Sequence, residues 1–152
     1  LGGSEWLVQH TGKVVGASVG IDLEAEAALQ HAMMELARAG IVHSAHDVSD
    51  GGLGVCLAES CIAHGHGAQV RLPSDEEAPP HALLFSEEPS RIVVSLPASH
   101  VGELGETCDR LGVPFERIGV VTGETLEVEG LCSVPVEELA EHHAQALDDI
   151  VG

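Results

Sequence analysis

Residues 44–63, SAHDVSDGGLGVCLAESCIA, decide the fold of this chain. An extended run at residues 41–46 leads into a turn that contains Gly51 and Gly52. After the turn, mostly apolar residues recur at intervals of three and four, which is typical of one face of a helix: Leu53, Cys56, Leu57, Ser60 and Cys61. The stretch therefore predicts a strand, a glycine turn and a helix over residues 53–64.

The turn combines features that favour a ligand with features that repel an anion. Its glycines let the backbone come close to a ligand, and the first amides of the following helix favour an anion. Asp47 and Asp50 would repel a phosphate unless a cation lies between them, because the turn carries no Lys or Arg. Three interpretations stay open: a phosphate bridged by Mg²⁺, a loop packed against a neighbour's phosphate site, or a structural turn in which Asp50 or Ser49 caps the helix.

The composition predicts one folded domain. The chain has 152 residues, of which 44% are hydrophobic and 2% aromatic, so an aliphatic core is expected. We expect a single domain over residues 1–152, in which residues 1–20 form a linker and edge segment. Residues 73–81 form a proline-bounded surface loop and are the best candidate for disorder.

The charge of the chain excludes two classes of partner. The formal net charge is −19, from 25 acidic and 6 basic residues. Nucleic acids and anionic membranes are bound through cations, so neither is an expected partner. No apolar run reaches the roughly 18 residues that cross a membrane, and no signal peptide is visible. Any anionic ligand needs Mg²⁺ or basic groups from another domain.

The cysteines and histidines show no disulfide or metal pattern. None of the four cysteines lies in a C-x-x-C spacing, so reduced thiols in a cytoplasmic protein are expected. His43 and His46, like His64 and His66, lack a matching third and fourth ligand, which favours solvated side chains over a metal site. No side chains form a nucleophile-and-base set, so no catalytic residue is assigned within this chain.

The rest of the sequence alternates between helices and strands. Helices are expected between Asp22 and Gly40, between Pro97 and Gly112, and over residues 136–150. Extended runs are expected at residues 6–9, 68–72, 90–96, 113–121, 125–128 and 131–134. Residues 125–128 are expected to pair with 113–121 through a turn at 122–124. This order predicts an α/β (α+β) fold with a mixed β-sheet and helices packed mainly on one face.

Four segments together resemble a known family. They are SAHDVSDGGL at residues 44–53, LGGSEW at 1–6, LFSE at 84–87 with RIVVS at 91–95, and IGVV at 118–121. Their order and spacing are similar to the C-terminal domain of the aminoimidazole ribonucleotide synthetase superfamily. Within it, the signature most resembles the large-subunit type of phosphoribosylformylglycinamidine synthases, which are similar to two fused copies of a two-domain unit. The form here looks like the second copy.

The resemblance implies part of an ATP-dependent C–N ligase of purine biosynthesis, which amidates formylglycinamide ribonucleotide and uses ATP and Mg²⁺. The isolated chain is expected to be inactive, because the family's N-terminal domains hold most of the Mg²⁺ ligands and phosphate loops. The cofactor-binding residues implied here are Asp47, Ser49, Asp50, Gly51 and Gly52. The substrate-binding residues implied here are Gly3, Ser4, Glu5, Glu87 and Arg91.

Several functional alternatives stay open. The implied partners are the N-terminal domains of the same synthetase, a glutaminase subunit, a small accessory subunit and the small-molecule substrate. The chain either forms one wall of a nucleotide and substrate cleft or acts as a structural and docking module. Since Pro89 has no side-chain donor, a structural version of the substrate site is favoured. The alternative family members are aminoimidazole ribonucleotide synthetase, selenophosphate synthetase and thiamine-phosphate kinase.

Overall fold

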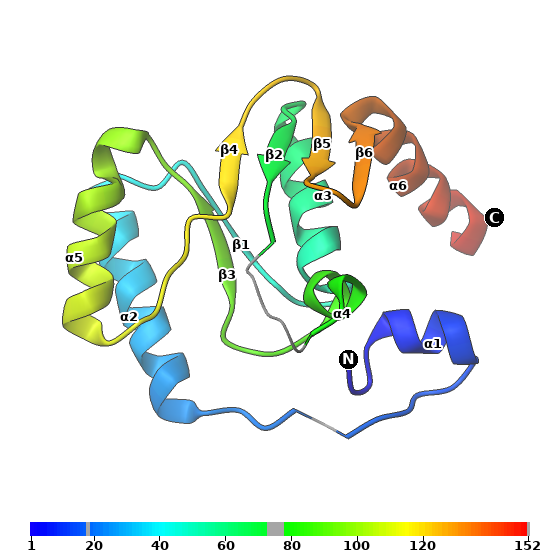
Figure 1. Ribbon diagram of the computed structural model, residues 1–152, viewed down its shortest axis with the longest axis horizontal. Coiled ribbons are helices and arrows are strands. Elements are labelled where there is room, and N and C mark those ends of the chain that lie inside the picture. Colours follow the sequence, from blue (N-terminus) through cyan, green and yellow to red (C-terminus); the bar gives the residue numbers. More distant parts are fainter. Residues whose placement is uncertain (18, 73–77, 152) are drawn as a thin grey trace. The chain divides into compact units, whose positions relative to one another are not determined.

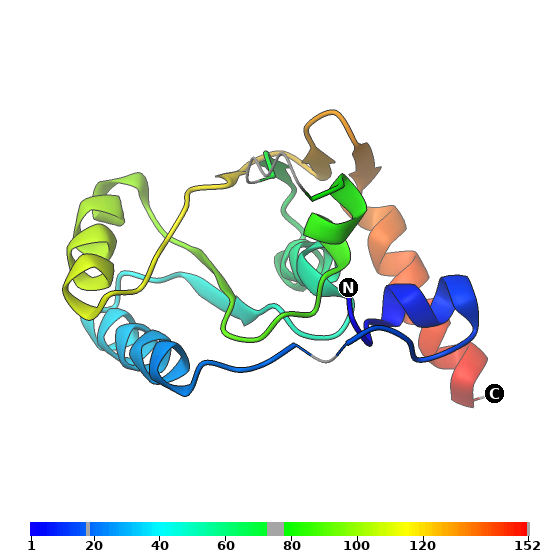
Figure 2. The same ribbon diagram turned by 60° about the horizontal axis from the view of Figure 1, so that its bottom comes forward.

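The computed structural model describes residues 1–17, 19–72 and 78–151, with side chains described as far as residue 146 (Figures 1 and 2). The chain divides into two compact units, and each is described by itself. The first unit contains Leu1–Cys56 and Phe85–Arg117, and the second contains Leu57–Leu84 and Ile118–Gly152. Within the described residues, every helix is too short or too polar to cross a bilayer.

The first unit is built around a two-stranded antiparallel ribbon. Strand β1 (Ser44–Asp47) pairs with β3 (Ile92–Ser95), with Ser44 opposite Ser95 and Asp47 opposite Ile92. The helical elements of this unit are α1 (Glu5–Thr11), α2 (Leu23–Ala39), the start of α3 (Gly52–His64), the short 3₁₀ turn η1 (Ala98–His100) and α5 (Val101–Leu111). Helices α2 and α5 lie side by side in both ribbon views (Figures 1 and 2).

Local signals place both ends of α2 and the C-terminal end of α5 where the sequence predicts them, while the 3₁₀ turn η1 separates Pro97 from the start of α5. The Asp22 carboxylate accepts hydrogen bonds from the amides of Glu24 and Ala25, so it caps α2. Gly40 and Gly112 follow the two helices with left-handed φ angles of 70° each. Between the helices and the ribbon lies a small core, which consists of Leu36, Ile41, Leu104 and Cys108 with partly buried neighbours.

The second unit contains a four-stranded mixed sheet in the order β4-β2-β5-β6. Its strands are β2 (Ala68–Val70), β4 (Gly119–Val121), β5 (Thr125–Val128) and β6 (Cys132–Pro135). Strand β2 is antiparallel to β4 and parallel to β5, and β5 is antiparallel to β6. Alternate residues of the two central strands, β2 and β5, are buried, so one face of these two strands is covered. Helix α6 (Val136–Val151) follows β6 directly.

The α/β class with a mixed sheet is confirmed, but three local expectations are wrong. Residues 6–9 lie in the helix α1, where an extended run was expected. Residues 113–118 form no regular strand, and only Gly119–Val121 pair. The described strands also form two separate sheets, where one was expected.

The pairing expected between residues 125–128 and 113–121 is wrong as well, because β2 lies between β4 and β5. The Gly67 amide donates to the Gly123 carbonyl at 2.8 Å, and Thr122 donates to the Gly67 carbonyl at 2.9 Å. A Cβ on Gly67 would lie 2.3 Å from the backbone of Thr125. The missing side chain therefore lets β2 enter beside the turn and separate the two strands.

The loop expected at residues 73–81 is tested only at its end. Residues 73–77 lie outside the described residues, so the expectation of disorder there stays a prediction. Pro80 and His81 belong to the helix α4 (Pro80–Phe85), so the loop ends before residue 80. The single-domain expectation for residues 1–152 also stays a prediction.

Candidate functional site

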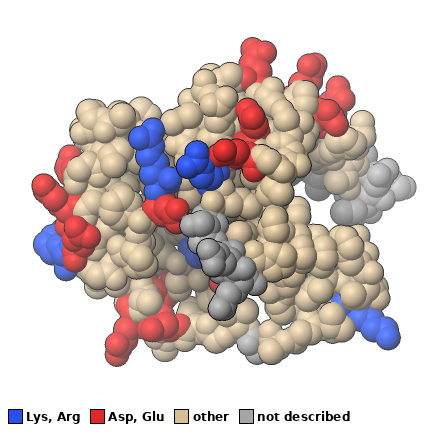
Figure 3. Space-filling model, in the orientation of Figure 1, with Lys and Arg blue, Asp and Glu red and all other residues tan. Residues whose placement is uncertain are grey.

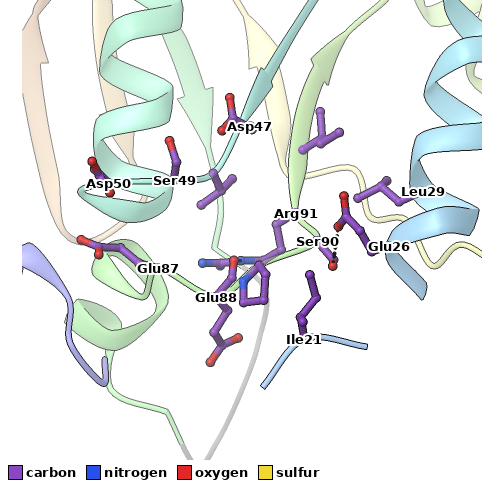
Figure 4. Close-up of a pocket in the computed structure, with 13 residues that line it drawn as sticks. Ile21, Glu26, Leu29, Asp47, Ser49, Asp50, Glu87, Glu88, Ser90 and Arg91 are labelled. Carbon is purple, nitrogen blue, oxygen red and sulfur yellow. Dashed lines mark hydrogen bonds between the residues drawn. The ribbon is translucent and has the colours of Figure 1, made fainter. Parts of the chain in front are cut away.

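A pocket of about 440 Å³ lies in the first unit, where β1 ends and β3 begins (Figure 4). Its walls come from the start of α2, the turn after β1 and the segment before β3. Asp47, Ser49 and Asp50 line it from the turn, while Glu87 and Arg91 line it from the opposite segment. The structure thus brings part of the expected nucleotide group beside part of the expected substrate group.

The turn after β1 requires glycine at its tip. Gly51 and Gly52 have φ angles of +79° and +68°, which lie in the left-handed region. The Gly52 amide donates to the Ser49 carbonyl at 2.9 Å and closes the turn. A Cβ on Gly51 would lie 2.3 Å from Val55 Cγ2, so a larger residue also collides with the first turn of α3.

Neither Asp50 nor Ser49 caps α3 among the described residues. Both side chains are exposed, and no hydrogen bond joins either one to a helix amide within the described chain. The interpretation in which one of these side chains caps the helix is therefore not supported. Instead, the amide of Gly51, immediately before the helix, donates to Glu87 Oε1 at 2.9 Å. The sequence gives no local signal for this contact, because Glu87 lies 36 residues away.

The same Glu87 oxygen also holds the N-terminal loop. The amide of Glu5 donates to Glu87 Oε1 at 2.8 Å. In that loop Gly3 has a φ of +75°, and its amide donates to the Val15 carbonyl at 2.8 Å. Ser4 is fully buried, and its hydroxyl has no hydrogen-bond partner among the described residues. The loop at residues 3–5 is therefore held against the segment that carries Glu87.

Arg91 is directed at the backbone of its own segment. Its Nη2 donates to the Ser86 carbonyl, and its Nε donates to the Glu88 carbonyl at 3.4 Å. Among the described residues it forms no ion pair with a carboxylate. Arg91 thus shapes the loop that carries Glu87.

Glu26 and Ser90 form a polar contact that the sequence did not predict. The Ser90 hydroxyl donates to Glu26 Oε2 at 2.6 Å across 64 residues of chain. This hydrogen bond, together with one from Gln30, lowers the pKa of the Glu26 carboxyl, although desolvation opposes the shift. Ser90 has a φ of +63°, which a serine rarely adopts. The contact therefore holds a strained residue at the pocket wall.

The charged residues of the pocket wall are mostly acidic. Glu26, Asp47, Asp50, Glu87 and Glu88 line it, and the only cationic residue in the described lining is an arginine, which bonds to backbone carbonyls. Figure 3 shows acidic side chains at several places on the face drawn, with Lys and Arg side chains beside some of them. A phosphate could enter such a pocket only with cations supplied from elsewhere.

The described residues do not form a magnesium site by themselves. No group of three or more His, Cys, Asp or Glu side chains within the described chain is arranged to hold a metal ion. The Asp47 side chain is 74% exposed, and among the described residues it belongs to no group of three or more potential metal ligands. A cation here would need ligands from a bound phosphate or from another part of a larger protein.

The fold and this pocket define the class to which the chain belongs. Residues 1–130 match the family described as AIR synthase related protein, C-terminal domain. The match covers most of the chain, and the chain belongs to this family.

Curated relatives within the family share one name. The chain is 42% identical over 150 residues to the phosphoribosylformylglycinamidine synthase subunit PurL of Anaeromyxobacter dehalogenans (strain 2CP-C), covering 92% of this chain and 20% of the relative. It is 44% identical over 133 residues to the subunit PurL of Cutibacterium acnes, covering 87% of this chain and 17% of that protein. The chain therefore spans about 20% of the length of the first of these relatives.

Solved structures support the fold. The chain is similar to the structure of PurLQS from Thermotoga maritima, with a TM-score of 0.72 and 23% identity, over 91% of this chain and 25% of that one. It is also similar to T. maritima PurL complexed with ATP, with a TM-score of 0.70 and 24% identity, over 79% of this chain and 22% of that one.

Proposed function

We propose that this chain is the C-terminal part of a phosphoribosylformylglycinamidine synthase, an ATP-dependent C–N ligase of purine biosynthesis. In this role it supplies one wall of a nucleotide and substrate cleft for the amidation of formylglycinamide ribonucleotide. The observation that carries the proposal is the 42% identity to a PurL subunit over 92% of the chain. The match covers 20% of this relative, so the rest of the active site is assigned to parts outside the matched segment.

On the nucleotide side we assign Asp47, Ser49, Asp50, Gly51 and Gly52. The support is structural: the glycine turn is held in one conformation, and the polar side chains next to it are exposed and line a pocket. A neighbouring solved structure in the same family carries ATP. When bound, Mg²⁺ would neutralise phosphate charge. The chain's own contribution is a fixed backbone surface and outer carboxylates, because its described residues form no metal-binding group.

On the substrate side we assign Gly3, Ser4, Glu5, Glu87 and Arg91. The support is that the N-terminal loop and the Glu87 segment meet at a single carboxylate oxygen. A T. maritima PurL structure carries FGAR, which is a relative's ligand and is proposed here for this chain. Arg91 serves this side by shaping the loop, since its guanidinium bonds to backbone carbonyls.

The proposed partners are the remaining domains of the synthetase, a glutaminase subunit and a small accessory subunit. A solved structure similar to this chain is described as PurLQS, and this name supports an assembly of several subunits. The strongly acidic composition, with a net charge of −19, supports a cleft whose cationic groups come from another domain. A cytoplasmic location is proposed because the relatives are named as enzymes of nucleotide synthesis.

A domain replacement tests this proposal. The matching segment of the A. dehalogenans PurL subunit is replaced by this chain, and ATP-dependent amidation of formylglycinamide ribonucleotide is measured with ammonia as nitrogen donor. We expect the hybrid to retain activity. Asp50→Asn, at the pocket, should lower kcat/KM roughly tenfold or more. Asp109→Asn, on the exposed surface of α5, is the matched control and should leave it unchanged.

The docking alternative has a distinct outcome in the same experiment. If this chain only holds other parts together, the hybrid should be active and assembled, and both Asp50→Asn and Asp109→Asn should be neutral. A folded hybrid without amidation activity would contradict membership in the synthase.

A further inference from the structure

One side chain links two segments that lie far apart in the sequence. Glu87 Oε1 accepts the amide of Gly51 at 2.9 Å and the amide of Glu5 at 2.8 Å. The donors are 36 and 82 residues away along the chain. Both contacts therefore depend on the same acceptor oxygen.

Each donor belongs to a segment with little conformational freedom. The turn that carries Gly51 is closed by the Gly52 amide, which donates to the Ser49 carbonyl at 2.9 Å. The N-terminal loop is fixed by the Gly3 amide on the Val15 carbonyl and by the burial of Ser4. A shift of either segment would pull its amide from Glu87, and the acceptor would have to follow. We call Glu87 Oε1, with the two amides that it accepts, the anchor.

We propose that Glu87 is a positioning residue that couples the turn at residues 47–52 to the loop at residues 3–5. Under the proposed function, on which this part rests, the coupling sets the nucleotide side against the substrate side. Only Oε1 is needed for it. Glu87 Oε2 has no hydrogen bond to any described residue, so a direct contact with substrate is compatible with the anchor.

Amide hydrogen exchange on the chain without ligand tests the anchor. Glu87→Ala should speed exchange of both the Gly51 and the Glu5 amides by roughly tenfold. Glu87→Gln should restore most of the protection, because its side-chain carbonyl oxygen can accept both bonds. Glu88→Ala is the matched control: its exposed carboxylate makes no hydrogen bond to a described residue, and neither amide should change.

Coupling is tested by a double substitution. Gly51→Ala displaces the turn and should speed exchange at the Glu5 amide while Glu87 is present. In the Glu87→Ala background, the same substitution should have no further effect on Glu5. A residue that merely packs against both segments would not give this dependence. If Glu87→Ala does not fold, Glu87→Asp, which is one methylene shorter, replaces it throughout.

Three results would overturn the proposal: loss of protection at only one amide, no rescue by glutamine, or additive effects at Glu5. None of these measurements uses nucleotide or substrate. A failure here would therefore leave the synthase assignment standing, and an inactive hybrid would leave the anchor standing.

Discussion

Replacing Gly51 with alanine should destabilise the chain by about 2 to 5 kcal/mol. Gly51 has a φ of +79°, and a left-handed conformation costs an L-residue about 1 to 2 kcal/mol. The new Cβ would also lie 2.3 Å from Val55 Cγ2 and 2.8 Å from Val55 Cβ, so the first turn of α3 must shift. Overpacking of this kind costs about 1 to 3 kcal/mol.

Two further variants separate these contributions. Gly112 has a φ of +70°, but a Cβ added there would meet nothing within 4 Å, so Gly112→Ala should cost only about 1 to 2 kcal/mol. Val55→Ala removes the closer of the two contacts and, in the Gly51→Ala background, should recover about 1 kcal/mol. Val55 is 37% exposed, so its truncation alone should have little effect.

Urea unfolding followed by circular dichroism measures the free energy of unfolding of the unaltered chain, the three single variants and the Gly51→Ala/Val55→Ala double variant. The reasoning predicts that Gly51→Ala is the most destabilised single variant and that Val55→Ala partly rescues it. Equal losses for Gly51→Ala and Gly112→Ala, with no rescue, would show that the close approach to Val55 does not constrain the turn.

Four other outcomes are expected. Burial raises the pKa of the Cys61 thiol, so at neutral pH it should react with a thiol reagent more slowly than exposed Cys132, and equal rates would contradict this. Leu36→Ala should cost about 2 to 5 kcal/mol in urea unfolding, and exposed Met34→Ala should cost far less; similar losses would refute the assigned core. A hydrogen bond from Arg110 lowers the pKa of Glu35 below its ordinary 4.5. The Glu35–Arg110 pair therefore stabilises the fold above pH 4.5, and this stabilisation is lost as the pH falls through the lowered pKa. Glu35→Gln should therefore flatten the acid side of the melting profile, and an unchanged profile would count against the pair. Calorimetry should find weak or no Mg²⁺-ATP binding to the chain alone, and a micromolar dissociation constant lost in Asp47→Asn would show a complete site.

Local chemistry explains why part of the fold was predictable. The capping carboxylate of Asp22 and the glycine at residue 40 lie within a few residues of the helix they bound. The turn at Gly51 and Gly52 follows β1 directly, and the apolar spacing after it matches α3. Such signals act between residues that lie close together in the sequence, so the sequence pattern alone is enough to predict the elements that they bound.

The rest depends on contacts between distant residues. The insertion of β2 between β4 and β5 requires the close backbone approach at Gly67, which resembles an ordinary turn in the sequence. Residues 5–11 are a short run whose apolar pattern does not separate helix from strand. At the site, the resemblance of the sequence to a family identified Glu87. The sequence did not predict the two amides that donate to Glu87, nor the hydrogen bond between Ser90 and Glu26.

Under the proposed function, the turn at residues 47–52 is one wall of a nucleotide cleft that is completed outside this chain. Hydrogen exchange of the hybrid PurL subunit, with and without a non-hydrolysable ATP analogue and Mg²⁺, measures it directly. The account predicts slower exchange at residues 47–52 in the hybrid and no change at the same residues in the isolated chain. Protection confined to an outer helix of the hybrid, with the turn unaffected, would contradict it and favour a docking role.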